Sequence, residues 1–96
     1  MKMPARHGRE AAEMLAVQAL AFIAEDPEKL SRFLGMTGIP PEEIRAAAGE
    51  RGFLAGVLEH MLADESLLVA FADSAGIHPA AIARARDAFG KPDDGM

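Results

Sequence analysis

Apolar residues recur at every third or fourth position along most of the chain, which is the spacing of an amphipathic α-helix. This pattern divides the chain into six predicted helices, four of which begin at Glu10, Pro41, Phe53 and Pro79, and two of which follow the N-caps Asp26 and Asp64. No segment alternates apolar and polar residues with the period of two that marks a half-buried strand. The sequence therefore predicts an all-α fold.

The first and fourth predicted helices are the most apolar. In residues 10–25 the apolar positions are Met14, Leu15, Val17, Ala19, Leu20, Phe22 and Ile23. We expect this helix to be largely buried. In residues 53–62 one clean stripe contains Phe53, Leu54, Val57, Leu58, Met61 and Leu62.

If one core cannot hide this much apolar surface, the surplus indicates a homodimer or a protein partner bound through an apolar helix surface. If the core absorbs it, the chain is a monomer.

Residues 11–48 and 49–86 align as two copies of one unit, with nine identical positions that all fall on caps, turns or core faces. Each copy contains a Gly-Ile-x-Pro-x-x-Ile stretch, at 38–44 and at 76–82. Glycine ends a helix readily because it adopts positive φ at little cost, and proline favours the start of the next helix. We predict a compact six-helix bundle of two related three-helix units about a pseudo-two-fold axis. It would span residues 10–89, with flexible tails at 1–9 and 90–96.

Composition restricts the classes of partner. The chain has a formal net charge of -5, so it has no average attraction for nucleic acid or for anionic membranes. No apolar run approaches the ~20 residues that a membrane-spanning helix needs. The absence of Cys excludes disulfides and thiolate metal ligands and fits a cytoplasmic protein. We therefore expect a cytoplasmic location and no membrane partner, and the negative charge disfavours a nucleic-acid partner.

One segment supports an alternative function. Residues 71–86, FADSAGIHPAAIARAR, resemble the helix-turn-helix of bacterial regulators. The small, turning and packing residues of that motif correspond to Ala72, Gly76, Ile77 and Ile82. In this motif Arg84, Arg86 and His78 would contact bases or phosphates. The other exposed positions of the second helix are mostly alanine, which makes few base-specific contacts. DNA binding by a regulator of this kind is thus the first alternative.

A small enzyme or ligand-binding protein is the second alternative. His60 and Asp64 have a helical spacing compatible with a metal, but a third ligand is missing. Asp26 and Asp64 are better explained as helix N-caps than as paired catalytic carboxylates. We assign no catalytic residue, no metal ligand and no cofactor.

The runs MLAVQALAFIAEDPEKLSRFLGMTG, at 14–38, and FLAGVLEHMLADESLLVAFADSAGIHP, at 53–79, resemble a family of small uncharacterised bacterial proteins grouped as a domain of unknown function. The resemblance implies a small all-helical cytoplasmic protein and supplies no activity, cofactor or site residue. Our leading hypothesis is therefore a non-enzymatic protein–protein interaction module, which self-associates or binds another protein.

Overall fold

The computed structural model describes residues 5–49 and 52–90. This part of the chain forms six α-helices and one 3-10 turn, and contains no strand, so the all-α prediction is confirmed. The elements are α1 (Ala5–Ala24), α2 (Pro27–Thr37), η1 (Pro41–Glu43), α3 (Ile44–Ala48), α4 (Phe53–Leu62), α5 (Glu65–Ala75) and α6 (Ala80–Ala88).

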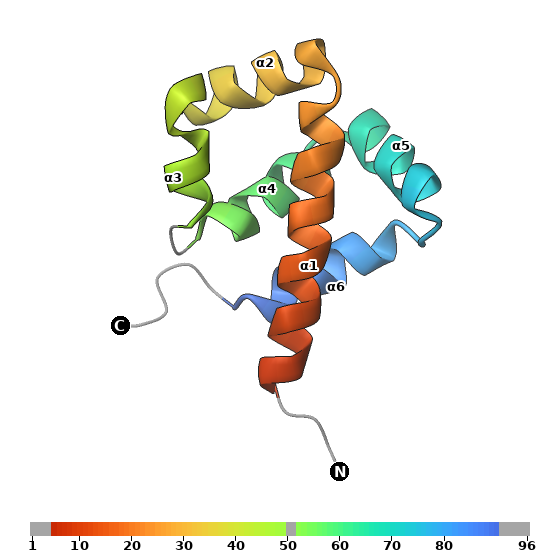
Figure 1. Ribbon diagram of the computed structural model, residues 1–96. Helices are drawn as coiled ribbons and strands as arrows, with labels where there is room; N and C mark the ends of the chain where they lie inside the picture. The colour runs from red at the N-terminus through yellow and green to blue at the C-terminus, as the bar shows by residue number, and fades with distance from the viewer. Residues whose placement is uncertain (1–4, 50–51, 91–96) are drawn as a thin grey trace.

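The long helix α1 organises the molecule. It packs against α6, α4 and α2, and α4 in turn packs against α5 and α6. Figure 1 shows α1 in front of α4 and α6, with α2 lying across its C-terminal end at a steep angle. The molecule is flat, with principal extents of 43 × 32 × 19 Å. Because a helix with its side chains is about 10 Å across, the thin dimension holds two layers of helices.

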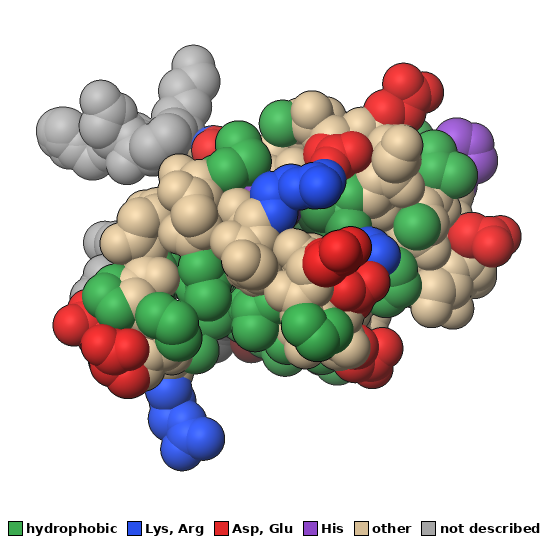
Figure 2. Space-filling view, turned by 90° about the horizontal axis from the view of Figure 1, so that it is seen from above, with side chains coloured by type: hydrophobic (Ala, Val, Ile, Leu, Met, Phe, Trp, Pro, Cys, Tyr) green, Lys and Arg blue, Asp and Glu red, His purple; other side chains and the backbone are tan. Residues whose placement is uncertain are grey.

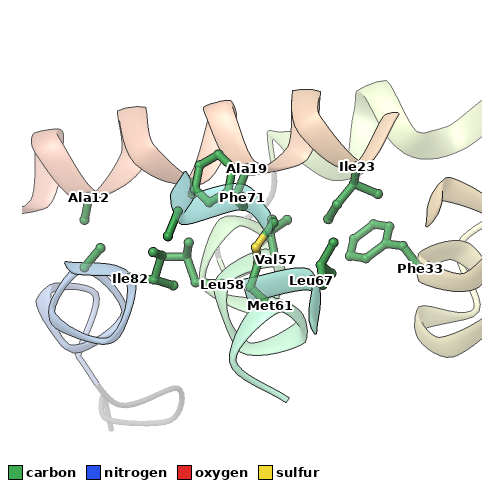
Figure 3. Close-up of a cluster of buried hydrophobic side chains, with 13 residues drawn as sticks. Ala12, Ala19, Ile23, Phe33, Val57, Leu58, Met61, Leu67, Phe71 and Ile82 are labelled. Carbon is green, nitrogen blue, oxygen red and sulfur yellow. The ribbon is translucent and has the colours of Figure 1, made fainter. Parts of the chain in front are cut away.

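The core lies under α1. Figure 3 shows the labelled buried side chains of α1 on one side of that helix, facing side chains from α4, α5 and α6, with Phe33 of α2 closing one end. The buried residues are Ala12, Ala16, Ala19, Ile23, Phe33, Val57, Leu58, Met61, Leu67, Phe71, Ala72, Ile82 and Ala85. The predicted stripe of residues 53–62 is confirmed as a core face. On α1 the buried positions are mostly alanine, which lets α4 and α6 approach the helix closely.

The predicted caps are confirmed at both junctions. Asp26 and Asp64 have extended backbones and accept hydrogen bonds from backbone N–H groups inside the following helix. Gly38 and Gly76 end α2 and α5 with φ of 76° and 71°. Such positive values are accessible to glycine because it has no Cβ.

The two halves of the structure are less alike than their sequences suggest. At Gly76 the N–H groups of residues 76 and 77 bond to the carbonyls of 73 and 72, a Schellman arrangement, whereas Gly38 makes a single bond to Leu34. The third helices also differ: residues 41–48 form a 3-10 turn and a short helix beside α4, whereas α6 packs against α1. The pseudo-two-fold bundle therefore remains a prediction.

Two further expectations differ from the structure. The first helix begins at Ala5, so residues 5–9 are helical rather than part of the predicted flexible tail; residues 1–4 and 91–96 lie outside the described part. The expectation that residues 10–25 are largely buried is wrong, since Met14 is 65% exposed and Val17 52% exposed. In a molecule two helices thick, α1 can bury only the face that meets the second layer.

Candidate functional site

The side of α1 opposite the core carries an exposed stripe that is apolar except at its N-terminal end and lies beside the exposed Gln18. It consists of Glu10, Met14, Val17, Ala21 and Ala24, which we call the outer face of α1, and all five residues are exposed. The separations of four, three, four and three residues are those of the a and d positions of a heptad. A stripe with this spacing stays on one side of a helix and is the pattern by which one helix packs along another.

The outer face of α1 is exposed because a different set of α1 residues packs into the core. The neighbouring positions Ala12, Ala16, Ala19 and Ile23 are essentially inaccessible to solvent and lie against the second layer. Since residues three or four apart share one helix face, burying these four turns Met14 and Val17 outward.

Other large apolar side chains at the surface are isolated. Met36 on α2 is 69% exposed and Val69 on α5 is 50% exposed, one on each helix. Single exposed hydrophobic residues are normal in proteins, whereas contiguous patches mark interaction sites. Within the described residues, only α1 carries two large exposed apolar side chains on one helix face.

The helix-turn-helix alternative assigns DNA contacts to three residues. His78 lies just before α6, and Arg84 and Arg86 lie on α6. The axes of α5 and α6 meet at 96° across a turn that contains Gly76 and His78. Both the angle and the short turn are typical of a helix-turn-helix. His78 accepts a hydrogen bond from the Ala80 N–H through Nδ1, at 3.0 Å, so it caps the start of α6 as a turn residue.

The two arginines of that alternative have different surroundings. The Arg86 side chain is 15% exposed; its Nε donates to Glu59 Oε2 at 2.6 Å and its Nη1 donates to the Gly90 carbonyl at 2.8 Å. Arg84 is exposed. Sequence reasoning missed the Arg86–Glu59 pair, because no local pattern indicates a contact between residues 27 positions apart. Arg86 is therefore engaged with α4, which leaves Arg84 as the exposed arginine of α6.

A cleft of about 220 Å³ lies between the first turns of α2 and α5 and the end of α4. Its polar and charged lining residues are Asp26, Glu28, Lys29, Arg32, His60, Asp64 and Ser66. Lys29 pairs with Asp26 at 3.0 Å within the first turn of α2, and Arg32 of α2 pairs across the cleft with Asp64 at 3.8 Å. The cleft thus gathers opposite charges in pairs.

His60 is a half-buried titratable group in this cleft. Its ring packs against that of Phe33 in a T-shaped arrangement with 5.0 Å between ring centroids, and burial lowers its pKa below 6.5 despite the nearby Asp64 carboxylate. The pKa of Asp26 is also lowered, first by its hydrogen bond from Lys29 and then by that from the Glu28 N–H. No third potential metal ligand joins His60 and Asp64, because the described residues contain no cluster of three His, Cys, Asp or Glu that could hold a metal ion.

One face of the molecule carries mixed charge. On the face seen in Figure 2, acidic and basic side chains are interspersed and hydrophobic side chains show between them. Among the described helices, none alone is long and apolar enough to cross a membrane; α5 and α6 reach that length and hydropathy only as a pair bent by 96°.

Comparison with known proteins supports the resemblance seen in the sequence. Residues 9–92 match the family described as "Protein of unknown function (DUF3572)". No curated protein and no solved structure matches the chain. Because the match extends over nearly all of the 96 residues, the chain belongs to the DUF3572 family of proteins of unknown function.

Proposed function

We propose that this protein is a non-enzymatic interaction module that binds another protein chain through the outer face of α1. The observation that supports this most is the exposure of Met14 and Val17 on a helix whose opposite face is buried. Covering an exposed apolar side chain with a partner removes it from water, which contributes roughly 25 cal/mol for each Å² of apolar surface buried. The absence of Cys fits action in the cytoplasm.

The spacing of the outer face indicates how the partner is held. Side chains at heptad a and d positions insert as knobs into holes on a facing helix, and small residues such as Ala21 and Ala24 leave room for the side chains of that helix. The expected partner surface is therefore an amphipathic helix that lies along α1, as in other helix-in-groove complexes. Residues in the cleft beside His60 have no role in this proposal.

Site-specific photocrosslinking tests the proposal. A photoreactive amino acid replaces Val17 in one variant and Val69 in the other, because these valines are 52% and 50% exposed and so make a matched pair. In cells that produce the protein, we expect a crosslinked product from position 17 and much less from position 69. Equal yields from the two positions, or none from position 17, would reject the outer face of α1 as a binding surface.

DNA binding is a second candidate, favoured by the 96° angle between α5 and α6. In this reading Arg84 contacts a phosphate or a base from the exposed side of α6. Fluorescence anisotropy with duplex DNA at low ionic strength tests it, because contacts to phosphates are strongest at low salt. The candidate requires measurable binding that weakens in Arg84→Ala; no binding at low salt would eliminate it.

A further inference from the structure

We propose that residues 27–49, which contain α2, η1 and α3 and which we call the arm, detach from the rest of the molecule when His60 takes up a proton. This inference concerns a different part of the protein from the outer face of α1 and does not depend on the proposed function. Among the side chains that the structure describes, all buried core residues except Phe33 belong to α1, α4, α5 and α6. Those four helices therefore share a core to which the arm adds one buried side chain.

The arm is held by an aromatic anchor. Phe33 is 1% exposed, and it is the one buried residue of α2; η1 buries none. Figure 3 shows Phe33 reaching from α2 toward the core. Its ring lies against two rings of α4, with 5.0 Å between centroids to His60 and 6.1 Å to Phe53. Because residues 53 and 60 are about two helical turns apart, they share one face of α4, and His60 forms part of the surface that holds the anchor.

The charged groups near His60 lie on both sides of the cleft. Those that line the cleft with it come from the beginnings of α2 and α5, and they are Asp26, Glu28, Lys29, Arg32 and Asp64. None of the described residues of α1, α3 or α6 lines the cleft. Burial is the largest influence on His60 and lowers its pKa; Asp64 opposes this effect and Arg32 adds to it. The surroundings of His60 therefore favour the neutral ring while the arm is in place.

A proton on His60 weakens the attachment of the arm for two reasons. The charged ring is half-buried against Phe33 and loses part of its hydration there, which costs free energy. It also competes with Arg32 for the Asp64 carboxylate, and that ion pair joins the arm to the start of α5. Detachment returns the imidazolium to water and uncovers Phe53. Because a helix of 11 residues is marginal on its own, we expect the detached α2 to unfold.

Amide hydrogen exchange of the full chain, followed by NMR, tests the proposal. Since α2 and α5 both contain 11 residues, their amides make a matched comparison. After correction for intrinsic exchange, α2 should be less protected than α5 at every pH, and its protection should fall between pH 7.5 and 5.0. The free imidazole has its pKa at 6.5, so linkage limits this fall to about 30-fold.

Two results of this measurement would overturn the proposal. Equal protection of α2 and α5 would mean that the arm never opens separately from the core. A rise in α2 protection at pH 5.0 would mean that the imidazolium attracts the Phe33 ring and holds the arm in place.

Variants identify the groups responsible. His60→Gln cannot titrate, so the fall in α2 protection should disappear; an unchanged fall would assign it to another group and overturn the proposal. Phe33→Ala removes the anchor, and at pH 7.5 the α2 amides should lose their protection while the α5 amides keep theirs. Loss in both helices would show that the arm and the core unfold as one unit, against the proposal. Met36→Ala, at a position of α2 that is 69% exposed, is the control and should change neither helix.

Discussion

Arg86 of α6 donates a hydrogen bond from Nε to Glu59 Oε2 of α4 at 2.6 Å, and the same guanidinium donates to the Gly90 carbonyl. One side chain thus joins two helices and a residue two positions beyond the end of α6. The Arg86 side chain is largely covered, whereas that of Glu59 is 53% exposed, so solvent screens the pair.

Replacing Arg86 should lower stability more than replacing the neighbouring arginine. We expect Arg86→Met to reduce the free energy of unfolding by about 1 kcal/mol, because it removes the contacts to Glu59 and Gly90. Arg84→Met, at an exposed position, should change it by less than about 0.5 kcal/mol. Urea denaturation of both variants measures the difference. Equal effects would show that the contact with Glu59 contributes no stability.

Replacing glycine by alanine should change the stability of the protein in opposite directions at two positions. Gly76 has φ of 71°, where a Cβ is strained, so Gly76→Ala should destabilise the protein by about 1–2 kcal/mol. Gly35 lies inside α2, and a Cβ added there meets nothing within 4 Å. Gly35→Ala should therefore stabilise the protein by roughly 0.5–1 kcal/mol. Thermal unfolding monitored by circular dichroism detects both shifts, and a stabilising Gly76→Ala would be inconsistent with the positive φ.

Asp64 should act through its cap rather than through its charge. Its Oδ1 accepts a hydrogen bond from the Leu67 N–H at 3.2 Å, and Asp64→Ala should cost about 1 kcal/mol, or roughly 4–8 °C in Tm. Asp64→Asn keeps a capping oxygen and removes the charge that faces Arg32. We expect Asn to retain most of the stability. If Asn were as damaging as Ala, the ion pair with Arg32 would be the important contact.

The lowered pKa of His60 makes stability depend on pH. In the folded protein, burial favours the neutral imidazole, whereas in the unfolded chain the group binds its proton near pH 6.5. The unfolded state therefore holds more protons as the pH falls below 6.5, and the free energy of unfolding should decrease there. Denaturation at pH 7.5, 6.5, 5.5 and 5.0 measures the slope.

The control for this pH dependence is His60→Gln, which cannot titrate. It should flatten the slope between pH 7.5 and 5.0, a window that avoids the titration of Asp26 below its ordinary value of 3.8. A slope as steep as that of the unchanged protein would mean that another group causes the loss.

The helices and their ends follow from short-range rules. An Asp before a helix, a Gly after it and a Pro near the next start each act within about four residues, through a capping bond, a permitted φ or a missing N–H. The helix ends at Asp26, Gly38, Asp64 and Gly76 could therefore be predicted correctly from the sequence alone. The start of α1 could not, because residues 5–9 contain no capping signal and Gly8 argues against a helix there.

The candidate site depended on contacts between distant parts of the chain. Periodicity and composition are properties of one segment, so the sequence predicts apolar residues on nearly all sides of α1. Contacts with the second layer turn Ala12, Ala16, Ala19 and Ile23 toward the core and leave Met14 and Val17 facing solvent. The same packing brings Arg86 to Glu59. A helix in a two-layer molecule can bury only one side, and which side it buries depends on how well each packs against helices far away in the sequence.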